Sequence, residues 1–130
     1  MICFTDCMAT FAEIVGDKFP EAATTDSRSF LPVMKDDLAY QVRDTLILNA
    51  KGRAAAFRHH NWKLITGKGP GGFTHWDGNP SEEPGGQLYN LEKDPSEQNN
   101  LWSEMPSKVK AMSALLAKEK ANKKNDKNLK

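Results

Sequence analysis

The chain is poor in cysteine, in long apolar runs and in net charge, and each shortage excludes a class of protein. Cys3 and Cys7 are the only two cysteines in 130 residues. Their spacing is neither a CxxC redox pair nor half of a zinc site with a visible second half. We therefore interpret them as small buried hydrophobes. No run approaches the roughly twenty apolar residues of a membrane-spanning helix, so we expect no membrane partner.

The charges nearly balance, with 18 basic and 17 acidic side chains and a net charge of +1. Only the segment 118–130 is locally basic, with six lysines against Glu119 and Asp126. No arginine or aromatic residue is interleaved there to grip phosphate or to stack on bases. We predict a solvated, disordered tail at 122–130 and no nucleic-acid partner. The alternative, a polyanion-binding tail, predicts strongly salt-dependent binding to DNA or RNA.

The first 37 residues contain one helical pattern and a connector. Met8, Phe11, Ala12 and Val15 recur at helical spacing, which predicts a helix with Thr5 or Asp6 as its N-cap and Gly16 just past its end. Before it, 1–4 looks like the end of a strand. The segment 17–37 has loop composition, and its prolines argue against a helix through it. The N-terminus has no basic start, and Asp6 interrupts its apolar stretch, so we predict no signal peptide and leave the compartment open.

The remainder predicts a small α+β domain. Short apolar runs separated by turn residues indicate strands at 42–49, 53–58, 62–66 and 87–91, joined as an antiparallel meander. An amphipathic helix is predicted over 108–120, and covering one face of the sheet is its simplest role. Val109, Met112, Leu115 and Leu116 form its apolar stripe.

A helix-start signature follows the last predicted strand. Asp94, Pro95 and Glu97 have the types and spacing of a capping residue, a first helical residue and a residue that reaches back to the cap. We predict one turn of helix there.

One surface has residues suited to binding. The stretch 67–86 is rich in glycine and proline and contains Lys68, His75 and Trp76. Long connections of this kind are often functional, and the histidine, the tryptophan and the neighbouring Asp77 could bind a sugar or an anion. Structural tethering of the loop by Trp76 is the competing interpretation. His59 and His60 would point to opposite faces of a strand, so they cannot share a metal.

Four segments together resemble the end of type I sulfatases, the arylsulfatase family of the alkaline phosphatase superfamily. Residues 5–10 (TDCMAT) are similar to the family's TDxxxT helix, and 26–32 (DSRSFLP) to its linker. Residues 58–65 (RHHNWKLI) are similar to its RxxxWKLI strand. The longest and most specific is 87–101 (QLYNLEKDPSEQNNL), similar to ELY[DN]LxxDPxExxNL. All four occur in family order.

The resemblance implies a domain organisation and a chemistry. Residues 1–37 would be a remnant of the large α/β domain and 38–121 the C-terminal subdomain. Family members hydrolyse sulfate esters with a formylglycine made in a [CS]x[PA]xR motif and with a calcium ion, and full-length relatives are often exported. Neither cysteine here lies in that motif. We therefore assign no catalytic residue, metal ligand or cofactor to this chain.

The leading interpretation is a C-terminal fragment of a sulfuric ester hydrolase that is inactive alone. Its implied partner is the N-terminal sulfatase domain, and only the complete enzyme would act on a sulfated carbohydrate or aryl sulfate. The alternative is a non-catalytic module, derived from a sulfatase tail, that binds a carbohydrate or a protein. Lys68, His75 and Trp76 are the residues we expect near the substrate.

Overall fold

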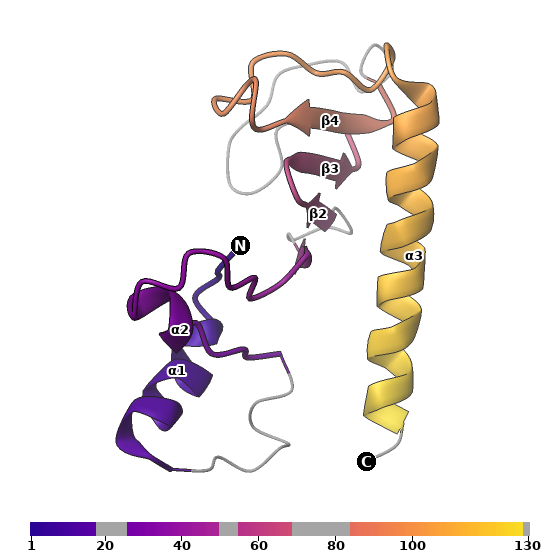
Figure 1. The fold of residues 1–130 in the computed structure, drawn as a ribbon. Helices are drawn as coiled ribbons and strands as arrows, with labels where there is room; N and C mark the ends of the chain where they lie inside the picture. The colour runs from indigo at the N-terminus through magenta and orange to yellow at the C-terminus, as the bar shows by residue number, and fades with distance from the viewer. Residues whose placement is uncertain (18–25, 50–54, 69–83, 129–130) are drawn as a thin grey trace. The chain divides into compact units, whose positions relative to one another are not determined.

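The structure is a computed structural model that describes residues 1–17, 26–49, 55–68 and 84–128 (Figure 1). It divides into two compact units, Met1–Asp44 and Thr45–Lys130. Within the described residues, no helix has both the length and the apolar composition needed to cross a membrane.

The first unit contains two helices, α1 (Asp6–Val15) and α2 (Leu31–Met34). The end of α1 is as predicted. Gly16 adopts a left-handed conformation with φ of 71°, and amides at the cap donate to the carbonyls of Ala12 and Glu13. This is the usual way in which glycine ends a helix. Thr5 occupies the N-cap position, but its side chain makes no capping hydrogen bond.

Two predictions for this unit are wrong. Met1–Phe4 is not a strand: Asp6 and Cys7 donate to the carbonyls of Cys3 and Phe4 in tight turns that lead into α1. The connector also contains α2, although its proline argued against a helix. Pro32 lies in the first turn of α2, where an amide hydrogen would have no helical acceptor.

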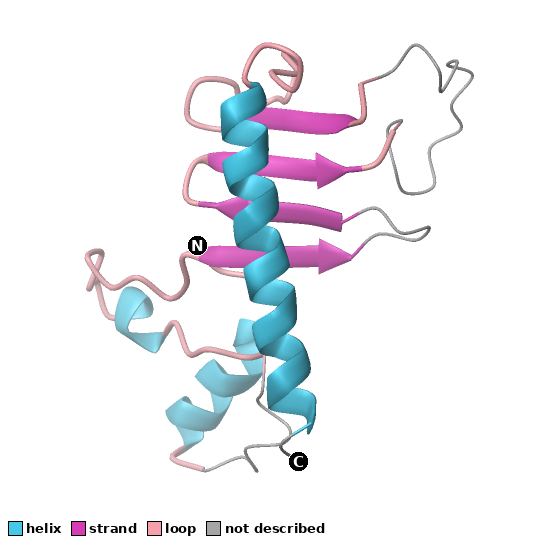
Figure 2. Ribbon diagram, turned by 90° about the vertical axis from the view of Figure 1, so that its right-hand side faces the viewer, coloured by secondary structure: helices cyan, strands magenta, loops and turns pink. Residues whose placement is uncertain are grey.

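The second unit is built on a four-stranded antiparallel meander with strand order β1-β2-β3-β4 (Figure 2). Between β2 and β3 the chain reverses at His60 and Asn61, and His60 has a positive φ of 51°. The predicted strands are therefore confirmed, with shorter or shifted ends. The strands are β1 (Thr45–Asn49), β2 (Ala55–His59), β3 (Trp62–Thr66) and β4 (Gly86–Asn90).

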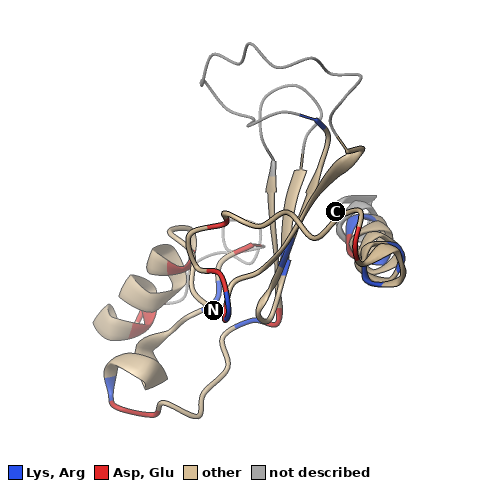
Figure 3. Cartoon of the chain, turned by 90° about the horizontal axis from the view of Figure 1, so that it is seen from above, with Lys and Arg blue, Asp and Glu red and all other residues tan. Residues whose placement is uncertain are grey.

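One helix, α3 (Pro106–Asn128), lies along one face of this sheet (Figures 2 and 3). The strand register places Phe57, Leu64 and Leu88 in one row across the sheet, and all three are fully buried. Met112 and Leu116 of α3 complete this core. The predicted α+β class and the apolar stripe of the helix are confirmed. The backbone is helical as far as Asn128, whereas we expected a disordered tail there.

The predicted turn of helix after β4 does not form. Asp94 does cap, but it caps a loop: its carboxylate accepts the amides of Gln98 and Asn99 at 3.1 and 2.8 Å. Those two hydrogen bonds lower the pKa of Asp94. Glu97 has a φ of 56°, which a right-handed helix cannot contain. Its carboxylate instead binds Lys63 Nζ at 2.6 and 2.7 Å.

Candidate functional site

The described residues contain part of the predicted substrate-proximal loop. Lys68 follows β3 and is exposed. His75 and Trp76 lie outside the described residues. The structure therefore does not test whether the three side chains come together, and their grouping stays a prediction.

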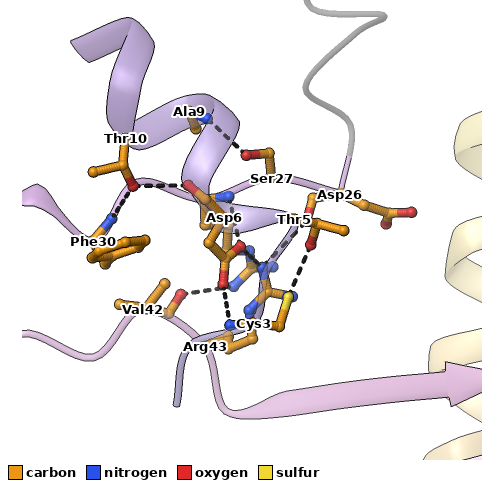
Figure 4. Close-up of polar contacts among 11 residues, drawn as sticks. Cys3, Thr5, Asp6, Ala9, Thr10, Asp26, Ser27, Phe30, Val42 and Arg43 are labelled. Carbon is orange, nitrogen blue, oxygen red and sulfur yellow. Dashed lines mark hydrogen bonds and ion pairs between the residues drawn. The ribbon is translucent and has the colours of Figure 1, made fainter. Parts of the chain in front are cut away.

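A buried polar cluster that the sequence did not predict lies in the first unit, around Asp6 (Figure 4). The Asp6 side chain is fully buried at the first position of α1. Its carboxylate accepts the amide of Cys3 at 2.8 Å and the amide of Arg28 at 3.0 Å. It also forms an ion pair with the guanidinium of Arg43. One side chain thereby joins the start of α1 to two segments far along the chain.

The next turn of α1 is held by hydroxyl groups. Thr10, also fully buried, donates its hydroxyl to the carbonyl of Asp6 at 2.7 Å and accepts the amide of Phe30 at 3.1 Å. The hydroxyl of Ser27 accepts the amide of Ala9 at 2.9 Å (Figure 4). These hydrogen bonds attach the segment before α2 to α1.

Arg43 completes the cluster from the end of the first unit. Its side chain is 8% exposed, and Nη2 also donates to the carbonyl of Asp26 at 3.2 Å. Its Nε is buried and has no hydrogen-bond partner among the described residues. Nη2 therefore donates to two oxygens, one on Asp6 and one on Asp26, whereas Nε makes no hydrogen bond within the described part of the chain.

The cluster keeps Asp6 ionised. Burial by itself raises the pKa of a carboxyl group because it disfavours the charged form. The amides of Cys3 and Arg28 and the charge of Arg43 outweigh that effect, so the pKa of Asp6 lies below its ordinary value of 3.8. A carboxylate with this many donors is a poor base and a poor nucleophile. The cluster is suited to positioning backbone, not to acid-base chemistry.

Among the described residues, the other reactive side chains do not gather into a centre. Cys3 and Cys7 are free thiols, and both are half-buried where we expected full burial. The rings of His59 and His60 lie 4.3 Å apart between centroids, so the expectation that they point to opposite faces is wrong. His60 is exposed and His59 is half-buried. In the parts of the chain that the structure describes, no three His, Cys, Asp or Glu side chains could hold one metal ion.

Comparison with known proteins identifies the region. No family model matches the chain. An N-acetylgalactosamine-6-O-sulfatase of Bacteroides thetaiotaomicron is 30% identical over 117 residues, covering 85% of this chain and 22% of the relative. An ulvan-active sulfatase of Formosa agariphila is 33% identical over 126 residues, covering 79% of this chain and 25% of the relative. In both cases the matched part is C-terminal. The chain corresponds to the C-terminal region of a sulfatase.

The fold of this sulfatase region is also found in a solved structure. That structure comes from work on the metabolism of multiple glycosaminoglycans by Bacteroides thetaiotaomicron. It matches with a TM-score of 0.64 and 26% identity, over 89% of this chain and 24% of that chain. The chain thus spans about a quarter of the length of the sulfatases it matches. The resemblance predicted from the four motifs is confirmed.

The sulfatase match offers a signal by which the Asp6 cluster could have been found. Two of the four motifs, 5–10 and 26–32, contain Asp6 and Arg28, and the structure joins them through the Asp6 carboxylate. Two separate motifs of one family are candidates for mutual contact. Arg43 lies in no motif, and nothing in the sequence singled it out.

Proposed function

We propose that these 130 residues are a C-terminal fragment of a sulfuric ester hydrolase and do not hydrolyse sulfate esters by themselves. The observation that carries the proposal is the extent of the match, since 85% of the chain aligns with only 22% of a sulfatase. The sequence supports it too, because neither cysteine lies in a formylglycine motif. Catalysis would then depend on a separate region that holds the formylglycine and the calcium ion.

The proposed substrate of the complete enzyme is a sulfated carbohydrate. One relative is named for N-acetylgalactosamine 6-O-sulfate and the other for activity on ulvan. We propose that the stretch 67–86 contributes to the choice of sugar through Lys68, His75 and Trp76. The exposed position of Lys68 after β3 is compatible with an electrostatic contact to a sulfate group. A tryptophan face would cover the apolar face of a sugar ring.

The test compares the chain alone with a chimera. In the chimera, this chain replaces the matched C-terminal region of the Bacteroides thetaiotaomicron sulfatase. Turnover of 4-nitrophenyl sulfate and of N-acetylgalactosamine 6-sulfate is measured for both proteins. We expect no turnover above buffer for the chain alone and measurable turnover for the chimera. Hydrolysis by the isolated chain would contradict the proposal.

The loop is tested within the same chimera. Replacing His75 and Trp76 by alanine should raise KM for the sugar sulfate and leave turnover of 4-nitrophenyl sulfate unchanged. Lys118→Ala, which removes an exposed charge of α3, is the control. An unchanged KM would remove the loop from the proposal. Binding of the isolated chain to a sulfated polysaccharide, lost in the same variant, would favour the non-catalytic module.

A further inference from the structure

Four side chains of the second unit gather beside the turn between β2 and β3, and we name them the Trp62 patch: His59, His60, Trp62 and Lys108. His59 and Trp62 are partners in the β2–β3 register, so their side chains lie on the same face of the sheet. The ring of His60 lies beside that of His59, and Lys108 Nζ lies 4.6 Å from the centroid of the Trp62 ring. Trp62 also packs against the core of the second unit, which holds its ring in place.

The polar atoms of the Trp62 patch are suited to an anionic ligand. Lys63 has its charge compensated by Glu97, whereas no carboxylate lies within ion-pair distance of Lys108 among the described residues. The indole N–H of Trp62 and the imidazole of the exposed His60 have no hydrogen-bond partner in the described part of the chain. Three side chains of the patch therefore retain donors for the oxygens of an anion.

We propose that the Trp62 patch is a binding subsite for a sulfated carbohydrate chain. The ammonium of Lys108 and the indole N–H bind sulfate oxygens, and the accessible part of the Trp62 ring contacts the apolar face of a sugar. The choice of sulfate rests on the proposed function. The carboxylate of a uronic acid has the same recognition chemistry, so the experiment compares the two anions.

The Trp62 patch is separate from the candidate loop 67–86. Strand β3 begins at Trp62 and ends at Thr66, shortly before Lys68, so the patch and Lys68 lie at opposite ends of β3. The strand between them is about 13 Å long. A single sugar sulfate cannot reach both places, whereas a chain of several sugars can. We therefore expect the patch to bind an oligosaccharide more tightly than a monosaccharide.

The experiment titrates the full chain with a hexasaccharide of chondroitin 6-sulfate and follows the indole N–H signals by NMR. We expect the Trp62 signal to shift and the Trp102 signal to stay in place, because Trp102 packs on Gly86 at the other end of β3. The chemically desulfated hexasaccharide keeps its carboxylates and should bind at least tenfold more weakly. Single-stranded DNA of equal charge should also bind at least tenfold more weakly, because Lys108 is the single permanent cation of the patch.

Matched variants separate the patch from general electrostatic attraction. Lys108→Met should raise Kd for the sulfated hexasaccharide about fivefold, as expected for the loss of one charge-assisted hydrogen bond at an accessible site. Lys110→Met removes the same charge from an exposed position two residues along α3 and should change Kd less than about twofold. His60→Asn, which tolerates the positive φ of this position, should also raise Kd and leaves the core untouched. Circular dichroism of each variant checks the fold.

Four results would overturn the proposal. They are an unchanged Trp62 signal at saturating hexasaccharide, equal affinity for the desulfated form, equal affinity for DNA, and equal effects of Lys108→Met and Lys110→Met. Subsite and proposed function fail separately. Hydrolysis of sulfate esters by the isolated chain would refute the proposed function and leave the subsite intact. Turnover by the chimera without a shift of the Trp62 signal in this chain would refute the subsite alone.

Discussion

The carboxylate of Asp6 and the guanidinium of Arg43 form a buried ion pair between residues 37 positions apart. Every other partner of this carboxylate is a backbone amide, so Arg43 is the only side chain among the described residues that compensates its charge. The ion pair therefore closes the first unit on itself. Few apolar contacts would hold this unit closed in its absence, since Ala12 and Val42 are the only buried hydrophobic residues in its described part.

Replacing Arg43 by methionine should open the first unit locally. Breaking a buried ion pair from one side costs about 3 to 5 kcal/mol, because the remaining charge is left unpaired. Two backbone amides still bind Asp6 in the variant, so we expect a cost at the lower end of this range, about 3 kcal/mol. That cost corresponds to roughly a hundredfold faster amide exchange in α1. Exchange in the second unit should not change.

Arg28→Met is the matched control for this variant. The Arg28 side chain is exposed and donates one long bond, 3.4 Å, to the carbonyl of Val42, while its backbone amide still binds Asp6 in the variant. We expect less than about 1 kcal/mol from its removal. Equal effects of the two substitutions would mean that the ion pair does not close the unit.

The first unit should also lose stability in acid. The pKa of Asp6 lies below 3.8 in the folded chain, so folding favours the charged form. Its contribution is fully present above about pH 4 and is lost as the pH falls through the folded pKa. Amide exchange of α1, corrected for its intrinsic pH dependence, should accelerate below about pH 4, and Asp6→Asn should remove that acceleration.

Asp94 provides a check on the second unit. Its pKa is lowered as well, by the amides of Asn99 and Gln98, so Asp94→Asn should alter the acid response of the loop after β4 and leave α1 unaffected. An acid response of α1 that persists in Asp6→Asn would assign it to another group.

Gly85 and Gly86 both lie beside the indole ring of Trp102, and they should respond differently to substitution by alanine. A β-carbon on Gly86 would lie 2.3 Å from Trp102 Cζ3 and 2.6 Å from the carbonyl oxygen of Ile65. The backbone oxygen cannot move without disturbing β3, so we expect Gly86→Ala to destabilise the second unit by about 1 to 3 kcal/mol.

Gly85→Ala is the control, because its nearest atom would be Trp102 Cζ2 at an ordinary 3.5 Å. Urea unfolding followed by tryptophan fluorescence measures both variants. If Gly86→Ala is as stable as the unaltered chain, the indole of Trp102 does not pack against Gly86 of β4.

The sequence predicted the second unit better than the first, for a physical reason. Short apolar runs bounded by turn residues and an amphipathic helix are local patterns, so 62–66 and the stripe around Met112 could be placed directly. The prediction of a helix start at Asp94 is wrong because a carboxylate that is followed by free backbone amides caps a turn as readily as a helix. The Lys63–Glu97 pair and the left-handed Glu97 then fix the turn.

The Asp6 cluster could not be predicted in the same way. Asp6 looked like a helix cap, whereas its partner Arg28 lies in the predicted connector and its partner Arg43 lies in the predicted strand 42–49. Long-range polar pairing leaves no local pattern in the sequence. The resemblance to sulfatases, by contrast, could be found from the order of the motifs alone, without knowledge of contacts between distant residues.

The stability of the second unit should depend on the buried row of Phe57, Leu64 and Leu88 that crosses its sheet. Leu64 and Leu48 lie on different strands and differ in burial, with Leu64 fully buried and Leu48 54% exposed. Truncating a buried leucine to alanine costs about 2 to 5 kcal/mol, because apolar contacts are lost and a cavity remains. We expect about 3 kcal/mol for Leu64→Ala and under about 0.5 kcal/mol for Leu48→Ala, measured by urea unfolding. The contrast tests the register, because a shift of β3 by one residue would turn Leu64 away from Phe57, Leu88 and α3. Similar costs for the two leucines would therefore refute the packing of α3 on this face.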